Sequence, residues 1–223
     1  MIAAPTIIIA DDHPLFRTAL RGTLESKLQG ASLLEASDFD SLQKSLEENS
    51  NANLLLLDLQ MPGAEGFSTL VFTTAHYPQI PVMIVSAHEE PDIIRRAIDH
   101  GASGFLPKSA PMQDMETALQ TVLEGNIWVP ANLPQKPYVE KEELTVAEAL
   151  ANLTPQQFRV ATMVNQGLLN KQIAYELNVT EATIKAHMTE IFKKLGVQSR
   201  TQVALVLDRL NINTPSNTDS FKK

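Results

Sequence analysis

The stretch IIIADDHPLF, residues 7–16, places two adjacent carboxylates directly after a run of β-branched apolar residues. A run of three isoleucines is typical of a strand that is buried in a sheet. Asp11 and Asp12 follow this strand at once, and their negative charges repel each other. A cation, a proton that takes part in catalysis, or solvent must offset this repulsion, and the rest of the chain has to indicate which.

The residues that follow alternate between strand patterns and helix patterns. Pro14 is suited to begin a helix, since its missing N–H costs nothing at the first helical position. The predicted strands are 6–10, 32–36, 53–59, 81–87 and 104–107, and the predicted helices are 14–28, 38–49, 67–77, 90–101 and 111–125. Five strand–helix units predict a flavodoxin-like α/β domain with a doubly wound five-stranded parallel sheet over residues 1–125.

The C-terminal part of the chain has a different pattern. Residues 126–149 contain three prolines and a charge run, which predicts a linker, although its last part leads into EELTVAEAL (142–150), which has a helical pattern. Short helices are predicted at 154–167, 170–178, 180–196 and 199–210, and the tail 213–223 is polar. Residues 150–212 are therefore expected to form a small all-α domain.

The composition narrows the possible classes of protein. The chain of 223 residues contains no cysteine, which excludes disulfides and thiolate chemistry. Residues 1–153 carry a net charge of −12 and residues 154–223 carry +4, which favours an acidic module joined to one that tolerates a polyanion. No apolar run approaches the roughly 20 residues that cross a bilayer, and the chain shows no signal-peptide pattern. We therefore expect a cytoplasmic protein without membrane association.

Polar side chains also follow three later strands of the predicted sheet. Asp58 comes after NLLLL, Ser86 after VMIV and Lys108 after GFLP. Because ligands of an open parallel sheet bind beyond the carboxyl ends of its strands, these side chains should converge with Asp11 and Asp12 on one edge. Each residue alone has an ordinary explanation as a helix cap, a turn former or a solvated charge. The combination within one α/β domain indicates a site.

Three carboxylates, a hydroxyl and an ammonium suit phosphoryl transfer. Mg²⁺ prefers oxygen ligands and needs only one or two carboxylates, so Asp11 and Asp12 are candidate ligands. An aspartate can act as a nucleophile and form an aspartyl phosphate. Asp58 suits this role because it stands alone after the central strand. The metal and Lys108 would neutralise charge on the transferred group, and the hydroxyl of Ser86 could donate a hydrogen bond to it.

The first 124 residues resemble response-regulator receiver domains. The matching segments, in the expected order and spacing, are IIIADDHPLFRTAL, LLLLDLQMPGAEGF, VMIVSAHEE and GASGFLPKS. The resemblance implies that Mg²⁺ (or Mn²⁺) is held by Asp11, Asp12, Asp58 and the backbone carbonyl of Gln60. It also implies that a histidine kinase or a small phosphodonor supplies the phosphoryl group.

The same resemblance implies roles for four further features. Asp58 would be the phosphoacceptor, and Ser86 and Lys108 would contact the phosphoryl group. Ser86 and Phe105 fall at switch positions, where burial of the aromatic ring tracks phosphorylation. A core aromatic is the plainer interpretation of Phe105, and both interpretations can hold together.

The C-terminal helices contain a helix–turn–helix pattern. Asn178 and Val179 form the predicted turn, and Thr180 is a natural N-cap of the second helix. Its apolar residues, Ile184, Met188, Ile191 and Leu195, fall on one face. The opposite face, Ala182, Lys185, Ala186, Thr189 and Lys193, is small, polar and basic. Such a helix can enter the major groove of DNA, although an amphipathic helix with solvated lysines has the same pattern.

Residues 153–205 resemble the LuxR-type DNA-binding domain through the segments NKQIA, TEATIKAH and KLGVQSR. The resemblance implies contacts with DNA from the following residues. Lys185 would be a main groove contact, and Asn170, Lys171, Thr183, Lys194 and Arg200 would lie near phosphates. Thr189 and Lys193 are further candidates, since they share the exposed face with Lys185. Gln157 and Gln172 depart from the glutamates that are usual in this family, which removes possible ion pairs within the domain.

The last helix carries four apolar residues on one side, which are Val203, Val206, Leu207 and Leu210. They can complete the domain core, and in the family this helix also pairs two domains, as palindromic DNA sites require. We expect both roles, and hence a homodimer in the active state.

The order of receiver, linker and LuxR-type domain resembles the NarL/FixJ family of transcription factors. It implies a phosphorylation-controlled regulator that binds double-stranded promoter DNA and is not a turnover enzyme. Two alternatives from other classes remain. The first is a magnesium-dependent phosphohydrolase with an aspartyl-phosphate intermediate, although Leu59 and Gln60 offer no further acid after Asp58. The second is an interaction module whose helical domain binds protein.

Overall fold

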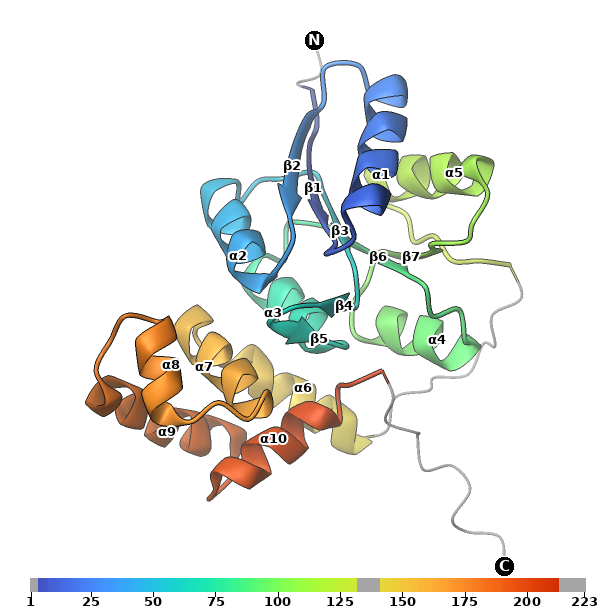
Figure 1. The fold of residues 1–223 in the computed structure, drawn as a ribbon. Coiled ribbons are helices and arrows are strands. Elements are labelled where there is room, and N and C mark those ends of the chain that lie inside the picture. Colours follow the sequence, from blue (N-terminus) through green and yellow to red (C-terminus); the bar gives the residue numbers. More distant parts are fainter. Residues whose placement is uncertain (1–3, 132–140, 213–223) are drawn as a thin grey trace, which may run out of the picture. The chain divides into compact units, whose positions relative to one another are not determined.

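The computed structural model describes residues 4–131 and 141–212 (Figure 1). The chain forms two compact units, residues 1–137 and residues 138–223. Within the described residues, no helix is long and apolar enough to cross a membrane. The predicted tail, 213–223, lies outside the described residues.

The first unit is an α/β domain with a five-stranded, wholly parallel sheet. Its strands are β1 (Thr6–Ala10), β2 (Ser32–Ala36), β3 (Leu54–Leu57), β6 (Val82–Ser86) and β7 (Gly104–Pro107), and its helices are α1 (Pro14–Lys27), α2 (Phe39–Glu48), α3 (Ser68–His76), α4 (Pro91–Asp99) and α5 (Met112–Leu123). The strand order is β2-β1-β3-β6-β7. This architecture confirms the predicted fold class.

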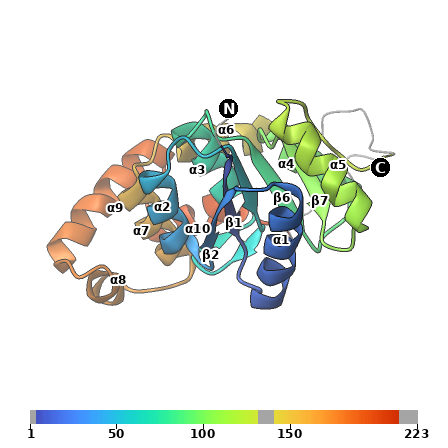
Figure 2. The same cartoon turned by 90° about the horizontal axis from the view of Figure 1, so that it is seen from above.

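The sheet is covered by helices on both faces, which explains why its central strands are apolar on both sides. Helices α1 and α5 pack on one face through a core that includes Leu20, Leu24, Ala118 and Val122. Helices α2, α3 and α4 lie on the other face, and Figure 2 shows β1 and β2 between α1 and α2. All four residues of β3 are buried.

Strand order reverses at β1, since the chain moves outward to β2 and then back to β3 on the other side of β1. Ala10 and Leu57 are paired at the carboxyl ends of β1 and β3. The residues that follow these two strands therefore lie beside each other at the switch point of the sheet, where open α/β sheets bind their ligands.

Two features of this unit were not predicted from the sequence. A short antiparallel hairpin, β4 (Gln60–Met61) and β5 (Ala64–Glu65), follows Asp58 and turns through Gly63, whose φ of 80° favours glycine. Beyond α5, Trp128 extends the sheet edge, because it pairs with Gly104 and exchanges backbone hydrogen bonds with Ser103 and Phe105. The start of the predicted linker thus belongs to the first unit.

The second unit is helical throughout its described residues. Its helices are α6 (Lys141–Ala151), α7 (Pro155–Asn165), α8 (Asn170–Glu176), α9 (Glu181–Leu195) and α10 (Arg200–Asp208). Helix α6 begins inside the predicted linker, and its residues Val146, Ala147 and Leu150 are buried. The apolar spacing of EELTVAEAL therefore determines the structure here, and the helical unit begins earlier than position 150.

Local capping explains where the helices of this unit begin and end. Thr154 and Gln157 form a reciprocal capping box at the start of α7. At the start of α9, Thr180 accepts a hydrogen bond from the backbone N–H of Thr183 at 3.1 Å, as predicted for an N-cap. Helix α9 ends at Gly196, which adopts the left-handed conformation that glycine allows.

Candidate functional site

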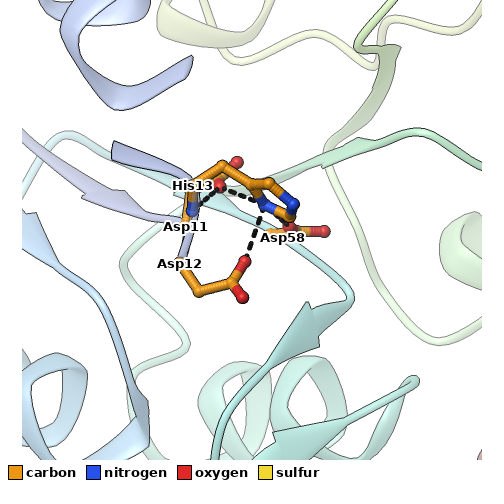
Figure 3. A group of neighbouring side chains, drawn as sticks. All are labelled: Asp11, Asp12, His13 and Asp58. Carbon is orange, nitrogen blue, oxygen red and sulfur yellow. Dashed lines mark hydrogen bonds and ion pairs between the residues drawn. The ribbon is translucent and has the colours of Figure 1, made fainter. Parts of the chain in front are cut away.

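The carboxyl edge of the sheet brings together the acidic residues that the sequence analysis singled out (Figure 3). Asp11 follows β1 and Asp58 follows β3, and the backbone N–H of Asp58 donates to the carbonyl of Ala10 at 2.8 Å. Both carboxylates are buried, with 1% and 4% of the residue exposed. Asp12 is half-buried at the mouth of the site. The predicted convergence of these three residues is therefore present.

Lys108, which follows the edge strand β7, reaches the carboxylates of Asp11 and Asp58. Its Nζ lies 2.7 Å from Oδ2 of Asp11 and 2.7 Å from Oδ2 of Asp58. Burial lowers the pKa of Lys108, but hydrogen bonds to the two carboxylates outweigh burial and raise the pKa above its usual value. Lys108 is therefore a permanent positive charge in the site. The ring of Phe16 lies 4.9 Å from the ammonium.

Asp58 remains short of positive charge despite this contact. Burial raises the pKa of the Asp58 carboxyl, and the neighbouring charge of Asp11 acts in the same direction, whereas Lys108 opposes them. One ammonium thus faces three carboxylates. A further cation would stabilise the ionised form of Asp58, which is the form that can attack a phosphorus atom.

Two oxygen atoms in the cluster are suited to hold such a cation. Within the described part of the chain, Oδ2 of Asp11 and Oδ1 of Asp12 are buried without a hydrogen bond of good geometry. Each instead lies 2.7 Å from a basic nitrogen, of Lys108 and of His13 respectively. Gln60 follows in β4, and its backbone N–H donates to Oδ1 of Asp58 at 3.1 Å. An oxygen-rich set of this kind fits a hard divalent cation such as Mg²⁺.

His13 is a member of this cluster that was not predicted from the sequence. Its Nδ1 lies 2.7 Å from Asp12, 3.2 Å from Asp11 and 3.8 Å from Asp58. His13 directly follows the paired aspartates in the chain, and this position is the one sequence signal of its place in the cluster. The fold reveals its orientation, because the turn into α1 directs the imidazole back toward the carboxylates.

Ser86 and Phe105 lie on the neighbouring strands. Both are fully buried, Ser86 at the end of β6 and Phe105 in β7. The hydroxyl oxygen of Ser86 accepts a hydrogen bond from the backbone N–H of His88 at 3.2 Å. The backbone carbonyl of Ser86 accepts one from the backbone N–H of Lys108 at 2.7 Å. The core interpretation of Phe105 is confirmed, and its role as a switch stays a prediction.

In the helical unit, α9 has the two faces that were predicted. Ile184, Met188, Ile191 and Leu195 are buried. Lys185, Thr189 and Lys193 are exposed on the opposite face, and Thr183 is partly exposed beside Thr180. The three exposed side chains can reach a groove of DNA without disturbing the core of the unit.

Three of the predicted phosphate contacts already hold bonds inside the unit. Lys194 donates to Oε1 of Gln157 at 2.7 Å and to the carbonyl of Asn152 at 2.9 Å. Arg200 donates to Oδ1 of Asn170 at 3.3 Å and to the carbonyl of Leu168. Of this predicted group, only Lys171 has an exposed side chain.

The two glutamines that depart from the family pattern both retain a hydrogen-bonding role. Gln157 accepts from Lys194, and Gln172 accepts from the backbone N–H of Leu169 at 2.7 Å at the start of α8. The neutral amide therefore replaces the expected carboxylate as an acceptor, without the ion pair.

The burial of α10 confirms the core role that was predicted for its apolar side, and the dimer role stays a prediction. Val203, Leu207 and Leu210 are buried in the core of the unit, and Val206 is partly buried. Val206 is the member of this predicted set that keeps some exposed surface. Leu205 is the apolar residue that α10 exposes, at 59%.

Both units of the chain match known protein families. Residues 7–120 match the model of the response regulator receiver domain, and residues 151–207 match that of the bacterial regulatory proteins of the luxR family. The glycerol metabolism activator of Pseudomonas putida is 38% identical over 205 residues, which cover 89% of this chain and 93% of that protein.

Two further comparisons agree with these matches. The nitrate/nitrite response regulator protein NarL of Escherichia coli (strain K12) is 32% identical over 204 residues, which cover 90% of this chain and 93% of that protein. A solved structure of the RcsB response regulator of Salmonella typhimurium superposes on this chain with a TM-score of 0.56 at 25% identity. The superposition covers 93% of this chain and 99% of that one, which is described by its conformational dynamism for DNA interaction. The chain therefore belongs to the NarL/FixJ family of response regulators, in which a phosphorylation-controlled receiver domain is joined to a LuxR-type DNA-binding domain.

Proposed function

We propose that Asp58 is the residue that accepts the phosphoryl group, and that this modification controls the binding of promoter DNA by α9. One observation carries the proposal: at the carboxyl ends of three strands, the ammonium of Lys108 lies 2.7 Å from the carboxylate of Asp58 and 2.7 Å from that of Asp11. The buried carboxylate of Asp58 supplies a nucleophile, and Lys108 supplies positive charge beside it.

In the proposed reaction, a carboxylate oxygen of Asp58 attacks the phosphorus of a phosphohistidine on a histidine kinase, or of acetyl phosphate. The new P–O bond forms as the P–N bond, or the P–O bond to acetate, breaks and the imidazole or acetate leaves. Lys108 can transfer its hydrogen bond from Asp58 to the phosphoryl oxygens, and the hydroxyl of Ser86 can donate to the same group.

Asp11, Asp12 and Asp58, with the backbone carbonyl of Gln60, are the residues that would hold Mg²⁺. The bound ion would stabilise negative charge on the phosphoryl group. The fit rests on the buried oxygens of Asp11 and Asp12, which lack a hydrogen bond of good geometry among the described residues. A cation held between the carboxylates would also keep the Asp58 nucleophile ionised, because it would offset the negative charge that Lys108 leaves unbalanced.

The output of the reaction is a change in the population of DNA-binding dimers. Phosphorylation biases a two-state equilibrium in which Ser86 and Phe105 respond at the ends of β6 and β7. Homodimers then place α9 of each copy in successive major grooves. The phosphoryl group modifies the protein itself, so the chain is a cytoplasmic regulator and not a turnover enzyme.

Mass spectrometry of the intact protein after incubation with acetyl phosphate and Mg²⁺ tests this function. We expect the native chain to gain one phosphoryl group that hydroxylamine removes, as it does from acyl phosphates. Asp58→Asn should gain none, and the exposed control Asp114→Asn should behave as the native chain does. Undiminished labelling of Asp58→Asn would move the phosphosite, and steady turnover of a small phosphate ester would favour the phosphohydrolase.

A further inference from the structure

His13 is turned into the acidic cluster although 62% of its side chain is exposed. Its Nδ1 lies within 4 Å of a carboxylate oxygen from each of Asp11, Asp12 and Asp58, at 3.2, 2.7 and 3.8 Å (Figure 3). The imidazole thus lies on the solvent-exposed side of the cluster, with Nδ1 turned toward the carboxylates.

These separations match those between ligand atoms of one metal ion. Octahedral bonds of about 2.1 Å place neighbouring ligands about 3 Å apart and opposite ligands about 4 Å apart. One ligand atom from each of Asp11, Asp12, His13 and Asp58 lies within 4.8 Å of the others. Only small side-chain movements separate this arrangement from a common coordination shell.

Lys108 is the group that such an ion would displace from the buried carboxylates. Asp11 is 1% exposed, and its Oδ2 has no hydrogen bond of good geometry among the described residues. Lys108 Nζ lies 3.4 Å from Nδ1 of His13 and now contacts both buried carboxylates. Its flexible stem lets the ammonium withdraw toward the phosphoryl position when a metal ion enters.

We propose that His13 is a metal ligand through Nδ1, an inference that rests on the proposed metal site of the receiver. An imidazole ligand changes which ions the site favours. Carboxylate, carbonyl and water ligands suit Mg²⁺, whereas imidazole suits Ni²⁺ and Zn²⁺ and strengthens their binding. His13 therefore makes the site a mixed nitrogen–oxygen site that accepts divalent transition-metal ions in competition with Mg²⁺.

Pulsed electron paramagnetic resonance of the full chain loaded with Mn²⁺ tests this assignment directly. Coordination by His13 should produce echo modulation from a directly bound ¹⁴N nucleus in the native protein. The modulation should disappear in His13→Gln and persist in His88→Gln, a matched control because the backbone N–H of His88 bonds Ser86 beside the site. A merely structural role for His13 would not produce this signal.

Calorimetric titration supplies the second measurement. His13→Gln should lower the affinity for Ni²⁺ by at least about tenfold, since the loss of even an outer-shell partner of a metal ligand typically costs about 10- to 100-fold. The affinity for Mg²⁺ should change by less than about threefold, since Mg²⁺ prefers oxygen ligands. Equal losses for both ions would overturn the proposal, because His13 would then act only by orienting the carboxylates.

The remaining outcomes separate this inference from the proposed function. Bound Mn²⁺ without ¹⁴N modulation, or modulation that survives in His13→Gln, would overturn the role of His13 and leave the carboxylate site intact. The metal site itself would be overturned if neither Mn²⁺ nor Mg²⁺ bound the native chain and if Asp12→Ala gave the same titration as the native chain.

Discussion

Lys194 at the end of α9 and Gln157 in the first turn of α7 are joined by a hydrogen bond of 2.7 Å between Nζ and Oε1. The same amide oxygen accepts a hydrogen bond from the backbone N–H of Thr154 in the capping box of α7. Lys194 also bonds the carbonyl of Asn152, just after α6. One ammonium therefore ties together three helices of the DNA-binding unit.

Lys194→Ala should destabilise the DNA-binding unit by about 1 to 3 kcal/mol, because it removes hydrogen bonds from a charged donor and leaves their acceptors less satisfied. Urea denaturation followed by circular dichroism would measure the free energy of unfolding. The neighbouring Lys193 is exposed, so Lys193→Ala should change stability by less than about 0.5 kcal/mol. Equal stability of the two variants would show that the bonds of Lys194 contribute nothing.

Asp38 supplies a prediction about pH. It caps α2, where its carboxylate accepts from the backbone N–H of Ser41 at 2.8 Å. Burial raises the pKa of Asp38, but the hydrogen bonds from Ser41 and Ser37 outweigh burial and lower it. A lowered folded-state pKa means that the stabilisation is complete above the unfolded value, about 3.9, and is lost as the pH falls through the folded value.

Asp38→Ala should therefore cost about 0.5 to 2 kcal/mol near neutral pH, as loss of an N-cap does. Asp38→Asn keeps a capping oxygen but cannot titrate, so it should be nearly as stable as the native chain at pH 7 and lose less stability in acid. Thermal unfolding at pH 7 and at pH 3 would compare the three proteins. An identical acid dependence in Asp38→Asn would remove Asp38 from the pH response.

Helix α10 gives a prediction that separates the core from the dimer surface. Leu207 is buried, and Leu207→Ala should destabilise the unit by about 2 to 5 kcal/mol. Leu205 is 59% exposed, so Leu205→Ala should leave stability nearly unchanged. If α10 pairs two copies, Leu205→Ala should still weaken self-association of the phosphorylated chain, which analytical ultracentrifugation would measure. Unchanged association would place the dimer contact on another element.

Much of the receiver could be predicted from its sequence because the signals are local. Apolar runs marked the strands, and parallel order then fixed which ends meet, which is why Asp11, Asp58 and Lys108 were brought together correctly. The hairpin after Asp58 was missed because each of its strands has only two residues, too few to show a period. Trp128 was assigned to the linker because nearby prolines dominate the pattern, whereas its pairing with Gly104 depends on tertiary structure.

Side-chain partners in the helical unit were harder to predict because they also depend on tertiary structure. Spacing correctly placed Ile184 and Met188 in the core of α9, since helical periodicity is a local property. It could not show that Lys194 reaches Gln157, or that Arg200 reaches Asn170, because each pair is separated by 30 or more residues. The apolar side of α10 was read correctly, but a periodic stripe does not reveal whether its own domain or a second copy covers it.

The orientation of α9 leads to the last prediction, which concerns Lys185. This side chain is exposed, opposite the buried Ile184, Met188 and Ile191. Lys185→Ala should therefore leave folding intact and weaken DNA binding. Contact with a base edge predicts a loss of about 1 to 3 kcal/mol, concentrated on the preferred sequence. Contact with a phosphate alone predicts a uniform loss and a salt slope that falls by about one.

Fluorescence anisotropy with specific and random duplexes at several salt concentrations separates these two cases. Lys141→Ala is the matched control, because it also removes one exposed lysine from the helical unit but lies on α6. Its effect measures the loss of one positive charge at a position outside the helix–turn–helix. If Lys185→Ala weakened neither duplex more than Lys141→Ala, α9 would not be the recognition helix, and the basic face opposite Ile184 would be only a solvated surface.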